Sequence, residues 1–142
     1  MPRISAFLMV CGAILVASCA GPKRPMLQDL AEHKDLPQFT LQSLAGVRDG
    51  DRLRAQAMIS DSSSILTLDM QYAIGSPTTL QSGTWRWEHT GQLTTGIIQA
   101  RSVTFLGGQD GPPSIGGTFD LTDANGAARY RVNLPVTELR RR

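Results

Sequence analysis

Apolar and polar residues alternate with a period of two along most of the chain from residue 39 onward. The alternation is clearest over residues 66–74, where every second position holds a large apolar side chain. This period places successive side chains on opposite faces of a β-strand, with one face directed at a core. The pattern therefore predicts about seven strands. Their ranges are 39–43, 52–59, 66–74, 85–89, 94–106, 115–121 and 128–134.

Short polar or glycine-containing segments separate these ranges, and both Asp49-Gly50 and Gly75-Ser76-Pro77 are typical of turns. No helical pattern lies between the predicted strands. Closely spaced strands with short links usually pair with their neighbours in the chain. We therefore expect an all-β domain, either a small antiparallel barrel or a sandwich, and the meander order favours barrel-like closure.

Within residues 94–106 the apolar face of the predicted strand changes side. Ile98 and Ala100 fall on one face, whereas Val103 and Phe105 fall on the other. One extra residue in a strand moves every later side chain to the opposite face. The sequence therefore predicts a β-bulge near Arg101.

A different periodicity precedes the β pattern. Leu27, Leu30 and Ala31 recur at helical spacing, and Pro25 and Pro37 stand where a helix would begin and end. This spacing predicts a short helix in the segment that leads to the domain. A helix of this length is marginal in water, so it would need to pack against the domain.

The longest apolar run lies at the start of the chain, where Arg3 precedes the uncharged stretch 4–17. A basic start, an apolar run and small residues at a cleavage point are typical of a secretory signal. The last four residues, Val16-Ala17-Ser18-Cys19, resemble the lipobox of bacterial lipoproteins. The resemblance implies that Cys19 carries acyl chains and becomes the first residue of the mature protein. Such chains would anchor the protein to a membrane without spanning it.

The lipobox resemblance also implies a location. In lipoprotein sorting of the enteric type, an aspartate after the cysteine retains the protein at the inner membrane, and Ala20 stands there instead. The resemblance thus implies the periplasmic face of the outer membrane, with the inner membrane, the cell surface and a soluble secreted protein as alternatives. The expected organisation is a signal peptide (1–18), a lipidated tether with a short helix (19–37), an all-β domain (38–139) and a solvated basic tail (140–142).

Charge and cysteine content limit the kinds of function that the mature protein could have. Removal of the signal takes away Arg3, one of the 14 basic residues, and leaves 13 against 12 acidic residues. This balance does not indicate a nucleic-acid-binding face. Cys11 would leave with the signal and Cys19 would be acylated, so the mature domain would have no free thiol. Disulfides and thiolate sites are thereby excluded for a processed chain.

Candidate residues for catalysis or metal binding are sparse. His33 and His89 lie in different segments, without the ligand spacing of a zinc site. The hydroxyls of residues 62–64 fall between two amphipathic ranges and are typical of a hairpin turn. The sequence therefore predicts no catalytic, metal-binding or cofactor-binding residues, and a protein that is not an enzyme.

An aromatic stripe is the main candidate for binding. Trp85 and Trp87 share one face of a predicted strand, and Tyr72 occupies the core-facing side of another. Such residues either fill a core or line a ligand or partner surface. The expected function is a non-catalytic binding or structural module of the envelope that contacts the membrane through its lipid and has an envelope protein as a candidate partner. An inhibitor of an envelope-active hydrolase, acting through the 107–113 loop, and a carrier of small apolar ligands are the alternatives.

Overall fold

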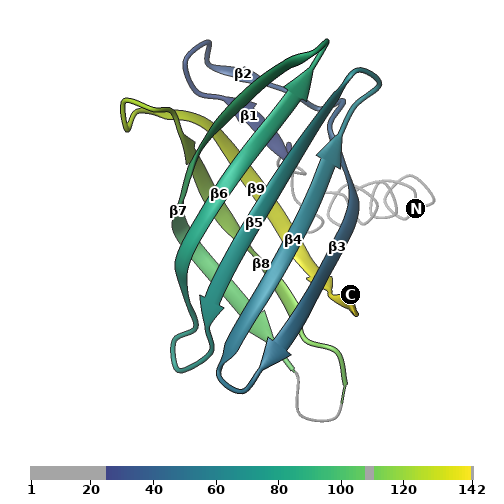
Figure 1. Cartoon of the computed structure of the whole chain (residues 1–142), viewed down its shortest axis with the longest axis vertical. Helices are drawn as coiled ribbons and strands as arrows, with labels where there is room; N and C mark the ends of the chain where they lie inside the picture. The colour runs from purple at the N-terminus through teal and green to yellow at the C-terminus, as the bar shows by residue number, and fades with distance from the viewer. Residues whose placement is uncertain (1–24, 108–110, 142) are drawn as a thin grey trace, which may run out of the picture.

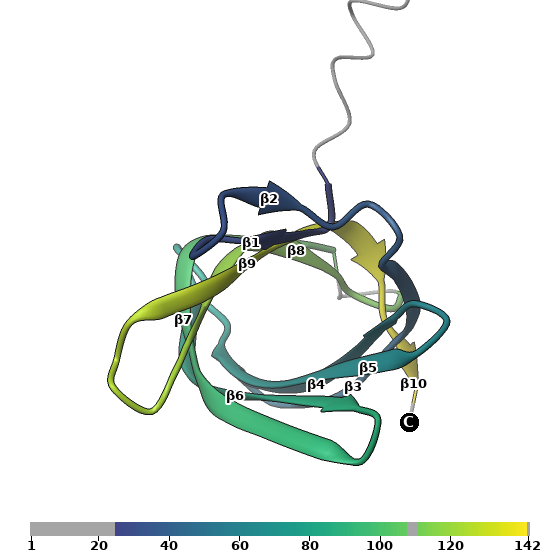
Figure 2. The ribbon, with the colours of Figure 1, turned by 90° about the horizontal axis from the view of Figure 1, so that it is seen from above.

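The computed structural model describes residues 25–107 and 111–141, and within these ranges the chain is all-β. Ten strands form one curled sheet in the order β10-β3-β4-β5-β6-β7-β8-β9-β1-β2 (Figures 1 and 2). The strands are β1 (Leu27–Asp29), β2 (Lys34–Asp35), β3 (Thr40–Asp49), β4 (Arg52–Ser60), β5 (Ser64–Ala73), β6 (Thr79–His89), β7 (Gln92–Leu106), β8 (Ser114–Thr122), β9 (Ala128–Glu138) and β10 (Arg140–Arg141).

The predicted all-β class with antiparallel pairing of neighbours is confirmed, and β3 to β9 correspond to the seven predicted strands. Two details of the prediction are wrong. The strands form a single sheet that curls as a half-barrel, so the sandwich alternative is wrong and the favoured barrel-like closure is only partial. Three further strands, β1, β2 and β10, are too short for alternation to be visible in the sequence.

The predicted short helix is also wrong, because its residues form the β1–β2 hairpin. Leu27 to Asp29 pair with Val132 to Tyr130 of β9. The Asp29 carboxylate accepts hydrogen bonds from the amides of Ala31 (3.0 Å) and Glu32 (3.1 Å), which fixes the turn. Pairing with β9 buries Leu27 completely. The free energy gained by burying Leu27 against β9, together with the hydrogen bonds of the local turn, outweighs the weak helical preference of so short a segment.

The predicted basic tail has exposed side chains at Arg140 and Arg141, as expected, but the backbone of these two residues forms a strand; Arg142 lies outside the described residues. Arg140 and Arg141 form β10, which pairs in parallel with Ala45 and Gly46 of β3. β10 follows β9 after a single residue, Leu139, whose side chain is buried. Burial of this leucine holds the chain end against β3, so β9 and β10 together link the two ends of the curled sheet.

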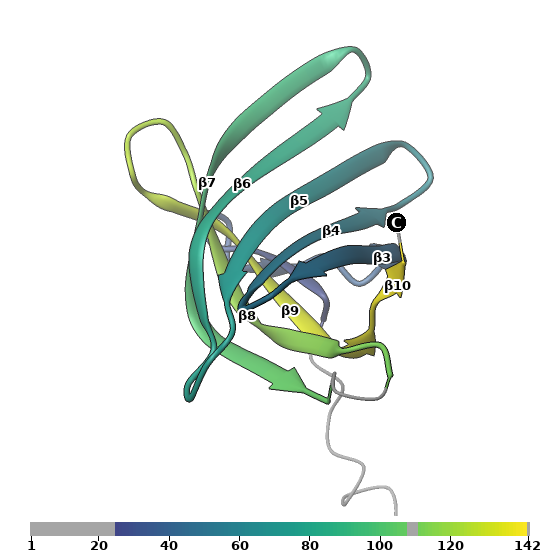
Figure 3. The ribbon, with the colours of Figure 1, turned by 60° about the horizontal axis from the view of Figure 1, so that its bottom comes forward.

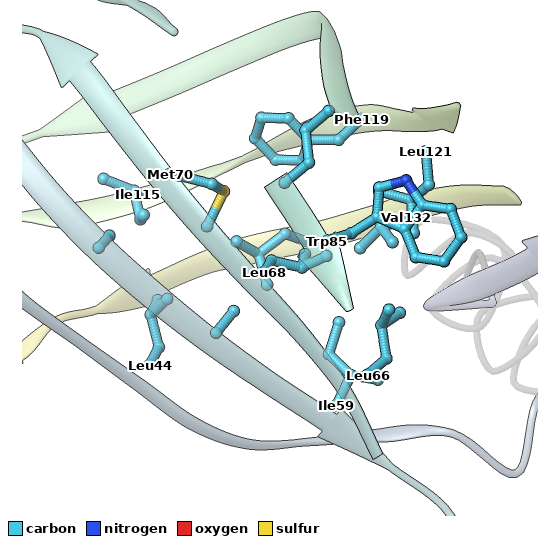
Figure 4. Close-up of a cluster of buried hydrophobic side chains, with 14 of the residues drawn as sticks. Leu44, Ile59, Leu66, Leu68, Met70, Trp85, Ile115, Phe119, Leu121 and Val132 are labelled. Carbon is cyan, nitrogen blue, oxygen red and sulfur yellow. The ribbon is translucent and has the colours of Figure 1, made fainter. Parts of the chain in front are cut away.

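The core lies inside the curl of the sheet (Figure 4). Trp85 is its largest side chain, and its indole Nε1 donates a hydrogen bond to the carbonyl of Thr122 (2.8 Å). Gly96, the partner of Trp85 on β7, leaves room for the ring: a Cβ there would lie 2.5 Å from Trp85 Nε1 and would also overlap the Thr122 carbonyl oxygen. The other fully buried large side chains are Tyr72, Phe119, Leu27, Leu53, Ile59, Leu66, Leu68, Met70, Ile115, Leu121 and Val132.

The predicted bulge at Arg101 is confirmed. The register between β7 and β8 shifts between Ala100 and Ser102, so Arg101 is the extra residue. β7 changes partner along its length: its first half pairs with β6, from Gln92 to Ile97, and its second half pairs with β8. At its tip the β6–β7 hairpin therefore pairs with β5 on one side only, and the start of β7 lies apart from β8 and β9 (Figure 3).

The bulge brings Arg101 to Asp120, which Arg131 also contacts. Arg131 donates from Nε to one carboxylate oxygen (2.8 Å) and from Nη2 to the other (3.4 Å), and Arg101 donates from Nη1 (3.2 Å). Burial raises the pKa of the Asp120 carboxyl, but the hydrogen bonds and charges of the two arginines lower this pKa by more. The pKa of Asp120 therefore lies below its usual range, and the folded state favours the ionised form.

Asp120→Asn is expected to lower the free energy of unfolding at pH 7 by about 1.5–3 kcal/mol, the range for hydrogen bonds to charged groups. A pKa lower in the folded than in the unfolded state gives a stabilisation that is present above the unfolded pKa. It is lost as the pH falls through the folded pKa. Urea unfolding is measured at a series of pH values from 7 to about 2. The difference in free energy of unfolding between wild type and Asp120→Asn should disappear in acid.

Asp49→Asn is the matched control, because Asp49 is exposed at the β3–β4 turn. Its effect should stay within about 0.5 kcal/mol across the series. If the difference in free energy of unfolding between wild type and Asp120→Asn stayed constant with pH, a stabilising role for the ionised carboxylate would be contradicted.

Candidate functional site

The structure separates the three aromatic residues that the sequence grouped as a candidate binding surface. Tyr72 and Trp85 are each only 1% exposed and belong to the core, where the Tyr72 hydroxyl donates to the sulfur of Met70 (3.1 Å). Burial raises the pKa of Tyr72, so its hydroxyl stays protonated. Trp87 is half-buried and packs against the edge of the core. Of the three residues, Trp87 is therefore the candidate for contact with a ligand.

Trp87 belongs to an aromatic cluster drawn from segments far apart in the sequence. Its ring lies tilted on Tyr130 of β9, with centroids 4.7 Å apart, and contacts the ring of Phe39 edge-on at 5.1 Å. Tyr130 in turn meets the buried Trp85 at 5.9 Å, which connects the cluster to the core. The guanidinium carbon of Arg129 lies 5.5 Å from the Tyr130 ring centroid. The cluster is thus packed against the core on one side.

A serine–histidine pair lies beside this cluster. Ser64 and His89 are direct partners across β5 and β6, and Ser64 Oγ lies 2.5 Å from His89 Nδ1. Either atom can be the donor, depending on which ring nitrogen carries the proton. Sequence reasoning missed this contact, because it placed the hydroxyls of residues 62–64 in a turn and treated His89 alone. Only the register of the hairpin brings the two side chains together.

Asp61 holds the turn that precedes Ser64. Its carboxylate accepts from the amides of Ser63 (2.8 Å) and Ser64 (2.7 Å). The hydrogen bond from Ser63 makes the largest contribution to a lowered pKa of Asp61, and the charge of His89 contributes in the same direction. In the part of the chain that the structure describes, no hydrogen bond joins Asp61 to His89. The arrangement is therefore a serine–histidine pair beside a capped turn, without the carboxylate that orients the base in a catalytic triad.

Together these groups line a cavity of about 340 Å³ at the upper end of the curled sheet in Figure 1. We call this cavity the mouth. Its floor, on the side of the core, is formed by Phe39, Trp87 and Tyr130, and its polar rim by Gln38, Ser64, His89, Gln92 and Thr94. The start of β5, the hairpin end of β6 and β7, and the segment between β2 and β3 supply these rim residues. The size lies at the lower end of the range of small-molecule sites, about 300–1,000 Å³.

The other candidates from the sequence are placed as follows. His33 lies in the β1–β2 turn with a φ of 52°, whereas His89 ends β6. Across residues 25–107 and 111–141, no group of three or more histidine, cysteine, aspartate or glutamate side chains could hold a metal ion. Within the same ranges, no helix has the length and apolar character needed to cross a membrane. Cys19, the lipobox and the centre of the 107–113 loop lie outside the described residues.

Comparison with protein families, curated proteins and solved structures gives no match for this chain. The site is therefore interpreted from its own geometry.

Proposed function

We propose that the protein is a lipid-anchored, non-catalytic binding module of the bacterial envelope whose ligand occupies the mouth. The observation that carries this proposal is the half-buried Trp87 on the floor of a cavity of about 340 Å³. A half-buried aromatic ring that packs against Phe39 and Tyr130 supplies apolar contact area, and this packing reduces the conformational freedom that the ring would lose on binding. The polar rim supplies the hydrogen bonds that orient a ligand.

The packing inside the curled sheet favours a ligand bound at the mouth over a ligand carried in the interior of the sheet. Side chains from β4, β5, β6, β8 and β9 fill the curl below the aromatic cluster. A ligand would therefore sit at the mouth, in contact with solvent, rather than deep between the strands. For the inhibitor alternative, residues 108–110 of the 107–113 loop lie outside the described residues, so no contact in the structure favours it.

The anchor part of the proposal rests on Val16-Ala17-Ser18-Cys19. Several acyl chains on Cys19 would give stable attachment, since each buried methylene contributes about 0.8 kcal/mol. The described chain begins at Pro25, six residues after Cys19. The intervening residues span at most about 20 Å, so the domain would stay close to its membrane and meet ligands and partner proteins of that surface.

Intact mass and membrane flotation of the full-length protein, beside a Cys19→Ser variant, test the anchor. We expect the wild type to gain the mass of acyl chains and to float with outer membranes, and the variant to do neither. A wild type that stays unmodified and soluble would contradict the anchored proposal.

Native mass spectrometry tests the mouth as a ligand site. The full-length protein is incubated with an extract of small molecules from bacterial envelopes, re-isolated and weighed under non-denaturing conditions. We expect a bound ligand on the wild type and on Gln99→Ala, which alters an exposed side chain of β7 away from the mouth. Trp87→Ala should lose the ligand. A ligand retained by Trp87→Ala, or no ligand on the wild type, would contradict binding at the mouth.

A further inference from the structure

The mouth combines an aromatic floor with polar groups that are free to bind. Among the residues that the structure describes, the side chains of Gln38, Gln92 and Thr94 form no hydrogen bond to another part of the chain. Each glutamine amide offers two donors and one acceptor oxygen, and the threonine hydroxyl offers both roles. The rim is therefore rich in neutral donors and acceptors.

The two carboxylates that also line the mouth are already occupied. Asp61 accepts two backbone amides, as described above, and Asp29 accepts the amides that fix the β1–β2 turn. Asp29 also pairs with Arg129, with 3.8 Å between Oδ2 and Nη2. The negative charges disfavour an anionic ligand such as a phosphate, while their existing partners reduce what they could offer to a cation.

A purely apolar ligand fits the mouth poorly. Seating an acyl chain over the rim would remove Gln38, Gln92 and Thr94 from water without giving them partners. Each polar group left unsatisfied in this way costs about 1–3 kcal/mol. The favoured ligand therefore has one apolar face for the Trp87 ring and a periphery of neutral hydrogen-bonding groups.

A pyranose ring has this chemistry, because its C–H groups form an apolar face and its hydroxyls, each both donor and acceptor, surround that face. We infer that the mouth binds a neutral carbohydrate, with Trp87 stacked on a sugar ring and the amides of Gln38 and Gln92 bonded to its hydroxyls. The inference rests on the proposed function and names its ligand class. A cavity of about 340 Å³ holds about one or two sugar rings, and its open side lets a longer chain continue outward.

Calorimetric titration of the full-length protein with two neutral trisaccharides tests the inference. Triacetylchitotriose represents N-acetylated amino-sugar chains, and maltotriose represents plain glucans. We expect at least one of them to bind with an affinity that is insensitive to salt, because no charge is involved. The member of the pair that binds identifies the type of chain.

Four variants assign the binding to the mouth. Trp87→Ala should weaken the affinity at least tenfold, and Gln92→Ala about three- to tenfold, as the loss of one neutral hydrogen bond predicts. Gln99→Ala, the same residue change on the same strand outside the mouth, should leave the affinity unchanged. Because Trp87 also supports Phe39 and Tyr130, Trp87→Phe keeps a ring for packing and should retain folding while losing part of the affinity.

Two outcomes would overturn the carbohydrate inference and leave binding at the mouth intact. The first is that only deacetylated chitotriose, which carries positive charges, binds and that salt abolishes this binding. The mouth would then be a site for a cationic ligand. The second is no binding of either neutral trisaccharide while the Trp87-dependent envelope ligand is present in the mass spectra. Absence of both kinds of binding would overturn the inference and the proposed function together.

Discussion

Trp85→Ala is expected to lower the free energy of unfolding by about 3–5 kcal/mol, the range for loss of a buried aromatic side chain. The Trp85 side chain is the largest in the core, and its ring packs over Gly96 and contacts Tyr130. The variant would leave a cavity between β6 and β8 and remove the donor to the Thr122 carbonyl. A collapse that fills the cavity is hindered, because Gly96 offers no side chain to move into it.

Urea unfolding followed by circular dichroism measures this loss, and two variants divide it into parts. Trp85→Phe keeps most of the apolar volume and removes the indole N–H, so it should account for the smaller share of the loss. Trp87→Ala is the matched control, because Trp87 is half-buried on the same face of β6 two residues later. If Trp85→Ala cost no more than Trp87→Ala, the assignment of Trp85 to the core and Trp87 to the mouth would be contradicted.

The alternation of apolar residues was sufficient to predict β3 to β9, because each of these strands has one face on a single core. The bulge was predictable for the same reason. The apolar side chains change from one face of the strand to the other within residues 94–106, which requires one extra residue, and that residue is Arg101. Strands β1, β2 and β10 escaped prediction because their pairing, of β1 with β9, of β2 with β1 and of β10 with β3, determines them and not their own pattern. Leu27, Leu30 and Ala31 fit a helix locally, but only Leu27 is buried.

The mouth was predictable only in part. The stripe of Trp85 and Trp87 identified the correct face of β6, but the sequence could not tell which of the two would be buried. That depends on how far along the curl each residue lies: Trp85 faces the middle of the sheet, and Trp87 faces its end. Contacts such as Ser64 with His89 depend on the register between β5 and β6, which no local pattern encodes.

Gly117→Ala is expected to lower the free energy of unfolding by about 3 kcal/mol or more, because two unfavourable effects coincide at this residue. Gly117 has a φ of +146°, a conformation that side chains disfavour, and such strain costs about 1–3 kcal/mol. A Cβ there would also lie 2.2 Å from the carbonyl oxygen of Ser102, directly after the bulge. Relief of that contact would separate β7 from β8 and weaken the hydrogen bond from the Thr118 amide to the Ser102 hydroxyl (3.0 Å).

Gly111→Ala is the matched control for this prediction. Among the residues that the structure describes, and leaving out its chain neighbours, no atom lies within 4 Å of a Cβ built on Gly111, so its substitution should change the free energy of unfolding by no more than about 0.5 kcal/mol. Both variants are compared by urea unfolding at one pH, with the slope of the transition checked for a change in the surface exposed. Equal stabilities for the two variants would mean that β7 does not approach β8 as closely as the bulge requires. The position of Arg101 beside Asp120, which depends on the same bulge, would then be in doubt as well, and the loss expected for Asp120→Asn with it.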